Sequence, residues 1–328
     1  MMVFHPETTR QALPPFDITT IVPNDGAVAD YCRFYHLDFE QDFPNIKHSC
    51  GYFEVAGYSV VAHSYVAAQA RGTVWVIHGY LEHSGLYRHI IPVLLAAHYS
   101  VVIYDLPAHG LSSGTRASIA SFAEYQQVLI HLIDYFNHQL PQPWLAIGQS
   151  TGAAILMDYV LSQYAQKKPV VFQRLLLLAP LVYPAKMQWL QLKLAFWWFK
   201  SVRSGLPRVF RQNTSDRDFV RFMRDEDPLQ AHWIPVSWLL ALKQWIEQIH
   251  KFPRCDCPVW VIQGGKDKTV NGDYNVAFIK NKFDVKSVLC LPEAGHQLVN
   301  ESLKFRQPIE VLLRKFLMDV QMPDENVN

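Results

Sequence analysis

Short apolar runs recur along most of the chain, and stretches compatible with helices separate them. The runs fall at 73–77, 100–104, 144–147, 174–179, 259–263 and 287–291. Their apolar character is continuous rather than alternating, which is typical of strands buried on both faces of a sheet. The pattern therefore predicts an α/β domain with a mainly parallel sheet covered by helices.

The first part of the chain follows a different pattern. Two more strands are expected at 51–55 and 58–65, because Ala56 and Gly57 between them are typical of a hairpin turn. Residues 1–47 contain prolines at positions 6, 14, 15, 23 and 44. This segment is predicted to be an irregular arm that lies over the domain.

The regular succession of strands and helices stops between residues 184 and 255. No buried-strand run occurs there, and Trp, Phe, Leu and Lys dominate the composition. We interpret this segment as a helical cap inserted between two strands of the sheet. The predicted organisation is an N-terminal arm over 1–47, a domain core split between 48–183 and 256–328, and a cap over 184–255.

A basic stretch lies within the predicted cap. Lys186, Lys193 and Lys200 recur every seven residues, so they share one face of a helix whose remainder is almost wholly apolar. One interpretation is a helix packed on the body with its lysines in solvent. The other is a surface that docks on lipid, with Trp189 and Trp197 lining a substrate pocket.

Composition and charge exclude some classes of function. The chain has 328 residues, of which 50% are hydrophobic, and a net charge of +1 gives no indication of a nucleic-acid partner. No apolar run approaches the roughly 18 residues of a membrane span, and the start lacks the apolar core of a signal peptide. The five cysteines form no CxxC pair, which favours reduced thiols in a cytoplasmic protein and no metal site.

The segment 148–152, which reads GQSTG, places a serine between an apolar run at 143–147 and a helical stretch at 153–161. A serine between strand and helix lies on a sharp turn, and the small residues on either side allow the chain to pass closely there. This arrangement is the nucleophile elbow, which exposes the hydroxyl and directs the helix N-terminus at the reacting centre. Ser150 is therefore the candidate nucleophile.

A serine hydroxyl needs a base, and the base needs a partner that holds its tautomer. Asp267 follows the run at 259–263 and His296 follows the next one, so the order Ser, acid, His is that of hydrolases with this elbow. Asp105 precedes the serine and is interpreted as part of a structural turn. His78 and His83 are interpreted as residues that hold the shape of their loop.

The oxyanion formed during acyl transfer needs two donors. One should be the N–H of Thr151, directly after the nucleophile. The other should come from the loop after the strand at 73–77, where the N–H of Tyr80 is the best candidate.

Several segments resemble monoacylglycerol lipases and bacterial lysophospholipases. Residues 78–87 are similar to the HGxGEHSGRY segment of that family, 105–112 to its DxxGHGxS turn, and 227–229 to the DPL that closes its cap. With the elbow, the GxxD loop and the AGH loop, the similarity covers about residues 50–316. Leu81 replaces the second glycine of the first segment, and Ala108 replaces a glycine of the turn.

The resemblance implies an α/β-hydrolase fold with an eight-stranded sheet and a helical cap. It implies hydrolysis of carboxylic esters of single-chain lipids through an acyl-enzyme on Ser150, without metal or cofactor. Leu81, Trp189 and Trp197 are the expected substrate contacts. The expected location is the cytoplasm, with peripheral contact at the inner membrane face through the cap.

Three alternatives remain open at this stage. A short-chain carboxylesterase or a serine aminopeptidase could use the same scaffold, and the peptidase would need acids such as Asp225, Glu226 or Asp227 to bind the substrate amine. A binding protein without catalysis is the third alternative, although such proteins typically lose a member of the triad. A carboxylate nucleophile, as in dehalogenases, is excluded because Ser150 occupies that place.

Overall fold

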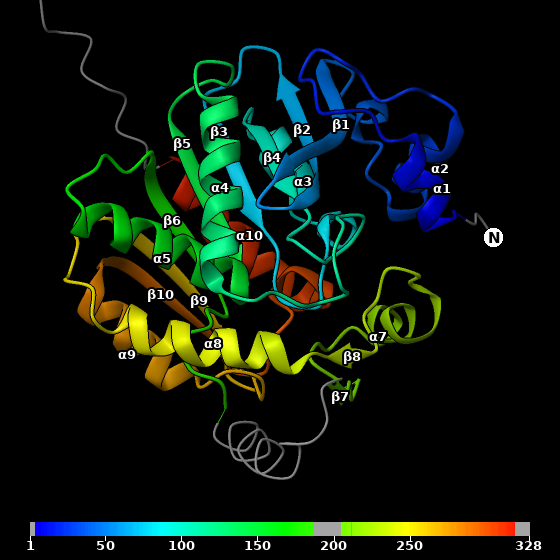
Figure 1. The fold of residues 1–328 in the computed structure, drawn as a ribbon. Coiled ribbons are helices and arrows are strands. Elements are labelled where there is room, and N and C mark those ends of the chain that lie inside the picture. The colour runs from blue at the N-terminus through cyan, green and yellow to red at the C-terminus, as the bar shows by residue number, and fades with distance from the viewer. Residues whose placement is uncertain (1–3, 186–204, 211, 319–328) are drawn as a thin grey trace, which may run out of the picture.

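Eight strands form one sheet in the part of the chain that the structure describes, and helices cover both faces (Figure 1). The structure is a computed structural model that describes residues 4–185, 205–210 and 212–318. In sheet order the strands are β1 (Ile46–Val55), β2 (Tyr58–Ala67), β4 (Ser100–Tyr104), β3 (Thr73–Ile77), β5 (Trp144–Gln149), β6 (Phe172–Leu178), β9 (Pro258–Gly264) and β10 (Asp284–Leu291). β2 is antiparallel to both neighbours, and the other pairs are parallel. The predicted mainly parallel sheet of eight strands is confirmed.

The helices form two groups, one on each face. One face carries α4 (Phe122–Phe136), α5 (Thr151–Ala165), α8 (Val236–Ile249) and α9 (Gly272–Lys282), and the other carries α2 (Gly26–Tyr35), α3 (Ile91–Ala96) and α10 (Leu303–Met318). Single turns of 3₁₀ helix, η2 (Ser84–Tyr87) and η4 (Leu298–Asn300), complete this second face. Trp75 and Ile77 of β3 pack with the first group, and Val74 and Val76 pack with the second. Burial on both faces explains the continuous apolar runs.

The hairpin of β1 and β2 has the predicted turn. Ala56 and Gly57 have φ angles of 53° and 79°, and a two-residue turn with both angles positive matches the twist of the flanking strands. Both strands are longer than predicted, since β1 begins at Ile46 and β2 ends at Ala67.

Buried polar residues interrupt the apolar pattern of both strands, and one of them, His48, lies in the part of β1 that was missed. His48 Nε2 lies 3.0 Å from His63 Nδ1, and His63 Nε2 lies 3.7 Å from the sulfur of Cys50. Both rings stack with Tyr65, and burial lowers the pKa of His63 to about 3, which keeps the ring neutral. Here polar side chains contact one another inside the sheet, so the strands do not show an apolar run.

The prediction that residues 1–47 are irregular is wrong. The described part contains α1 (Pro6–Ala12), α2 and the 3₁₀ turn η1 (Phe39–Gln41). Pro6 is the first residue of α1, where a missing N–H costs no helical hydrogen bond. A proline at such a position is compatible with a helix, so this proline did not indicate irregular structure.

The N-terminal segment also covers the β1 edge of the sheet. Pro14 accepts a hydrogen bond from the N–H of Tyr52 at 3.0 Å, and the N–H of Phe16 donates to the carbonyl of Tyr52 at 2.8 Å. Farther along, the N–H of Val22 donates to the carbonyl of His48 at 2.8 Å. The edge groups of β1 at Tyr52 and His48 are therefore paired with the chain's own N-terminal segment.

The opposite edge is β10, which is less buried than its apolar run predicted. Its side chains alternate between exposed and partly buried, and Lys286, Val288 and Cys290 are exposed. Burial of this strand on both faces was a wrong prediction, because an edge strand lacks a neighbour and helical cover on one side.

The described part of the predicted cap contains helices and a short ladder. α7 (Arg217–Arg221), the π-helical turn η3 (Phe222–Glu226) and α8 are present, and β7 (Leu206–Pro207) pairs with β8 (Trp233–Ile234). Figure 1 shows α8 beside the core and the other elements beyond its end. The predicted helix with Lys186, Lys193, Lys200, Trp189 and Trp197 lies outside the described residues.

Among the residues that the structure describes, no helix is both long and apolar enough to cross a membrane.

Candidate active site

Ser150 occupies a strained turn between β5 and α5. Its φ and ψ angles are 52° and −108°, a region that few non-glycine residues adopt. A side chain at Gly148 would lie 2.5 Å from the nitrogen of Ala153, and one at Gly152 would lie 2.0 Å from the carbonyl oxygen of Ile77. The predicted sharp turn is confirmed, and both flanking glycines are required by close backbone contacts.

Two loops bring His296 and Asp267 to this serine. His296, on the loop after β10, places Nε2 at 3.0 Å from the Ser150 hydroxyl oxygen. Its Nδ1 lies 2.7 Å from Oδ2 of Asp267, which follows β9. The N–H groups of Thr269 and Val270 donate to Oδ1 of the same carboxylate at 2.7 and 3.1 Å. The three residues selected from the sequence therefore form one hydrogen-bonded row.

The electrostatics of this row suit a base and its partner. Burial alone would lower the pKa of His296, but the attraction and hydrogen bond of Asp267 outweigh burial and raise it above the ordinary value of 6.5. Burial would raise the pKa of Asp267, yet His296 and the two backbone donors lower it. A carboxylate held ionised beside the ring stabilises the imidazolium that forms on proton transfer.

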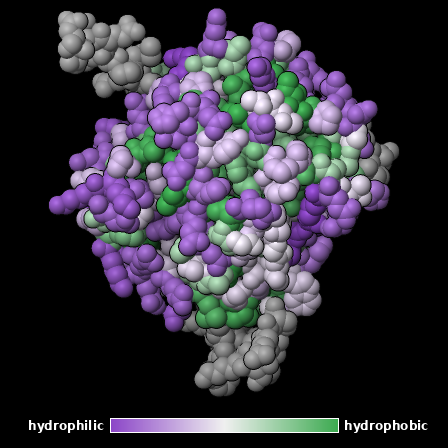
Figure 2. Space-filling model, turned by 45° about the horizontal axis from the view of Figure 1, so that its top comes forward, coloured by the Kyte–Doolittle hydropathy of each residue, from purple (hydrophilic) through white to green (hydrophobic). Residues whose placement is uncertain are grey.

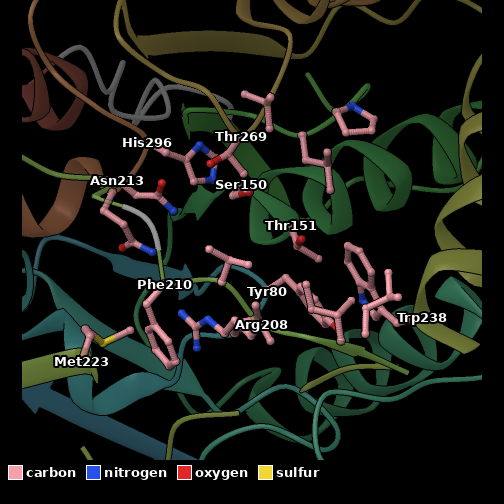
Figure 3. Close-up of a pocket in the computed structure, with 18 of the residues that line it drawn as sticks. Tyr80, Ser150, Thr151, Arg208, Phe210, Asn213, Met223, Trp238, Thr269 and His296 are labelled. Atoms are coloured by element: carbon pink, nitrogen blue, oxygen red, sulfur yellow. Dashed lines mark hydrogen bonds between the residues drawn. The ribbon is translucent and has the colours of Figure 1, made fainter. Parts of the chain in front are cut away.

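Tyr80 and Thr151 flank the serine (Figure 3). Thr151 is the first residue of α5, so its N–H is one of the first-turn groups that have no acceptor within the helix. Tyr80 lies in a turn closed by a 3.2 Å hydrogen bond from the N–H of Glu82 to the carbonyl of Gly79. Its ring stacks on Trp238 of α8 with centroids 3.6 Å apart, which fixes the turn against the predicted cap.

A cavity of about 300 Å³ opens at Ser150. Leu81 is part of its wall, as predicted, together with apolar side chains from the predicted cap and the core, among them Leu181, Leu206, Phe219, Met223, Leu239 and Leu242. No Asp or Glu is among the lining residues that the structure describes. Trp189 and Trp197, the other expected substrate contacts, lie outside the described residues. The described wall is thus mostly apolar and carries no negative charge.

Comparison with known proteins identifies the family. The Hydrolase_4 family, described as serine aminopeptidase, S33, matches residues 68–303. The chain belongs to this family.

Individual relatives of this Hydrolase_4 chain carry lipase names. Monoglyceride lipase of Rattus norvegicus is 22% identical over 273 residues, which cover 80% of this chain and 86% of the relative. Phospholipase YtpA of Bacillus subtilis is 32% identical over 88 residues, covering 27% and 34% of the two chains. The solved structure of a soluble variant of monoglyceride lipase from Saccharomyces cerevisiae has a TM-score of 0.70 at 16% identity and covers 94% of this chain and 99% of its own. This structural likeness confirms the α/β-hydrolase fold.

The two departures from the lipase-like segments have a common geometry in this Hydrolase_4 protein. Leu81 has a φ of 65° and Ala108 a φ of 63°. Each is the third residue of a turn closed by a hydrogen bond between its first and fourth residues, and glycine is favoured there. The resembling family has glycine at both places, which these left-handed conformations explain.

The histidines and the acid interpreted as structural do hold the loops. His78 lies 2.8 Å from the carbonyl of Gly79, and its Nε2 accepts the N–H of Leu106 at 2.8 Å. Asp105 accepts from the N–H of Ser84 at 2.8 Å and from the N–H of Leu111 at 2.7 Å. These interpretations are confirmed.

Three side chains around the row were not selected from the sequence. Gln149 donates to the carbonyl of His296 at 2.8 Å, and Gln297 donates to Glu82 at 2.7 Å. Glu82, the last residue of the turn that contains Tyr80, is buried and accepts the N–H of Gly79 at 3.0 Å. Burial raises the pKa of Glu82. Its place in the lipase-like segment was a signal that the sequence analysis quoted but did not use.

Proposed function

We propose that this protein is a serine hydrolase that cleaves carboxylic esters of single-chain lipids, with Ser150, His296 and Asp267 as its triad. The observation that carries the proposal is that Ser150 and His296 of the hydrogen-bonded row line a cavity whose described wall is mostly apolar. Relatives named monoglyceride lipase and phospholipase support the substrate class.

The mechanism follows from the geometry. Ser150 attacks the ester carbonyl carbon while His296 Nε2, 3.0 Å from the hydroxyl oxygen, takes its proton. The N–H groups of Thr151 and Tyr80 stabilise the oxyanion, and the departing alcohol receives the proton from His296. Water then attacks the acyl-enzyme, again with His296 as base, and the fatty acid leaves. Asp267 holds the ring and stabilises its cationic form.

The acyl chain would be bound by burial of apolar surface. Each methylene group moved from water into an apolar wall gains about 0.8 kcal/mol. A chain of several methylenes in this cavity therefore supplies most of the binding energy, while the ester lies at Ser150. A short-chain substrate would leave the wall unused.

The cavity does not suit the amine of a peptidase substrate, although the family description names an aminopeptidase. Asp227 is buried and bonded to His83 at 2.9 Å and Tyr35 at 2.6 Å. Asp225 pairs with Arg224 at the surface, and Glu226 lies 3.4 Å from Arg221. None of these acids lines the described wall. Nothing in the described cavity would neutralise a substrate ammonium.

The division into an arm, a split core and a cap over 184–255 remains part of this proposal, as does peripheral contact of the cap with a membrane. Two features support the contact. Residues 185–215 contain six Lys or Arg and no acid. Val209, Trp233 and Leu240, all within the predicted cap, are exposed. Elsewhere, on the face drawn in Figure 2, hydrophobic patches are interspersed among hydrophilic residues.

The test is hydrolysis of a matched panel by the purified protein and by Ser150→Ala. The panel contains a monoacylglycerol, a lysophospholipid, p-nitrophenyl esters of increasing acyl length and an aminoacyl anilide. We expect the single-chain lipids and long esters to react best and Ser150→Ala to lose all activity. Ser162→Ala, a serine on the same helix α5, should retain it. Preference for the anilide, or full activity of Ser150→Ala, would refute the proposal.

A further inference from the structure

One charged side chain in the cavity wall has no role in the proposed acyl transfer. Arg208, directly after β7, is the single Lys, Arg, Asp or Glu among the described residues that line the cavity. In Figure 3 it lies next to Phe210, away from the pair of Ser150 and His296. An arginine is an unexpected residue in a wall built to bind an acyl chain.

The side chain of Arg208 is held in place by neutral groups. Its Nη1 donates to the side-chain oxygen of Gln230 at 2.6 Å and to the carbonyl of Ala231 at 3.2 Å. The guanidinium carbon lies 4.3 Å from the centre of the Phe210 ring. Its backbone N–H donates to His232 at 2.9 Å. The orientation of the guanidinium is therefore fixed in the absence of a ligand.

No carboxylate neutralises this cation by contact. Among the residues that the structure describes, none forms an ion pair with Arg208, and its Nε and Nη2 donate to none of them. Asp227 and Glu82, whose charges act on Arg208 without a hydrogen bond to it, already accept hydrogen bonds from other groups. Burial lowers the pKa of Arg208 to about 10, so the side chain remains charged at neutral pH.

A fixed, partly desolvated guanidinium whose Nε and Nη2 have no acceptor among the described residues is a binding group for an oxyanion. Phosphate and carboxylate oxygens match the planar fork of arginine and form short, charge-assisted hydrogen bonds with it. A neutral glycerol hydroxyl would use this charge poorly. A substrate ammonium would be repelled.

We propose that Arg208 binds the phosphate of the substrate head group, and that the preferred substrates are lysophospholipids rather than monoacylglycerols. This rests on the proposed function and names its substrate class. The ester then lies at Ser150, the acyl chain along the apolar wall, and the glycerophosphate at Arg208.

The first measurement compares two substrates with the same acyl chain, lysophosphatidylglycerol and monoacylglycerol. We expect the wild type to prefer the phosphate-bearing lipid. Arg208→Gln should lower kcat/KM for it on the order of ten- to a hundred-fold, with less than about a threefold change for monoacylglycerol. Arg208→Lys should lose less than Arg208→Gln. Arg224→Gln, which removes an exposed arginine of η3, serves as the matched control and should change neither substrate.

Three outcomes would overturn the inference. One is a wild type without preference for the phosphate. Another is an equal loss on both substrates in Arg208→Gln, which would make Arg208 a structural residue. The third is that Arg208→Gln is inhibited less by free fatty acid than the wild type but keeps the same substrate preference. This result would mean that the arginine binds the carboxylate of the product.

A binding measurement separates this inference from the proposed function. Ether-linked lysophosphatidylglycerol and its glycerol analogue are titrated into Ser150→Ala, with and without Arg208→Gln. Tighter binding of the phosphate analogue that disappears with Arg208→Gln supports the head-group site even if no ester is hydrolysed. Equal binding of both analogues refutes it even if esters are hydrolysed.

Discussion

At the scale of single residues, Leu81 and Ala108 occupy backbone conformations that favour glycine. Placing an L-residue in the left-handed region costs about 1–2 kcal/mol. The side chain of Leu81 lines the cavity, whereas Ala108 is buried in the turn after β4. The chain thus tolerates strain in the turn 79–82, and the side chain of Leu81 narrows the space beside Ser150.

The strain at Leu81 can be tested by two substitutions. Asn adopts the left-handed region readily, whereas a β-branched residue there is an outlier. We expect Leu81→Val to unfold more easily than Leu81→Asn by about 1 kcal/mol, although Val is the closer apolar match. Urea denaturation measures the difference. The opposite order would show that apolar contact, not backbone conformation, dominates at this position.

The raised pKa of His296 predicts the acid side of the activity profile. The base acts when neutral, so kcat/KM should be lost as the pH falls through a value above 6.5. The contribution of this residue to stability has the opposite sign, being complete below 6.5 and lost as the pH rises through the folded-state pKa. A pH–rate profile with a long-chain p-nitrophenyl ester measures the first effect.

Asp267→Asn isolates the cause of that shift. Loss of the carboxylate removes both its attraction for the His296 ring and the hydrogen bond to it, so kcat/KM should fall by several orders of magnitude. The acid limb of the pH–rate profile measured on the remaining activity should move to lower pH. An unchanged limb would mean that another group controls the profile.

At the scale of elements, Asp227 joins three segments of the chain. It accepts hydrogen bonds from Tyr35 of α2 at 2.6 Å, from His83, which follows the turn 79–82, at 2.9 Å, and from Gln230 at 2.6 Å. Gln230 in turn accepts from Arg208. One buried carboxylate therefore connects the N-terminal segment, the loop of Tyr80 and the described part of the predicted cap.

Removing this charge should destabilise the protein. Asp227→Asn leaves buried donors without their charged partner, and we expect a loss of about 3 kcal/mol in the free energy of unfolding. Asp225→Asn is the matched control, because Asp225 is exposed and its surface pair with Arg224 is screened by solvent, so its loss should change the free energy of unfolding little. Chemical denaturation compares the two. Equal effects would contradict the role of Asp227 as a connection.

The helices and strands also show which parts of the fold could be predicted from the sequence. The runs at 73–77 and 100–104 coincide with β3 and β4, because strands buried on both faces have a distinct composition. The start of β1 escaped notice because His48, in the missed part of the strand, is polar yet buried. The helices of the N-terminal segment escaped because prolines were taken as breaks.

At the scale of the whole molecule, the candidate site lies where loops follow the carboxyl ends of neighbouring parallel strands. Ser150, Asp267 and His296 could be selected because each follows a recognisable strand, and parallel strands end at one edge of the sheet. Arg208 and Gln297 could not be selected in this way. Their positions depend on contacts between segments far apart in sequence, which no local pattern records.

The N-terminal segment makes a prediction at this scale. Deleting residues 1–22 removes the partners of Tyr52 and His48 along β1, so an unpaired strand edge becomes available to other copies. We expect the shortened protein to self-associate far more than the full chain at the same concentration. Light scattering over a dilution series measures this. Identical behaviour of the two proteins would contradict the protective role.

The two edges of the sheet therefore differ in what they permit. Because β1 pairs with the chain's own segment, β10 is the open edge of the eight-stranded sheet in the described part of the chain. When the same edge of two copies pairs, the two molecules are related by a two-fold axis, and both edges are then buried in the contact. Growth of a continuous sheet from one molecule to the next would require a second open edge. In the native chain, association of this kind would end at two molecules and not extend into a filament.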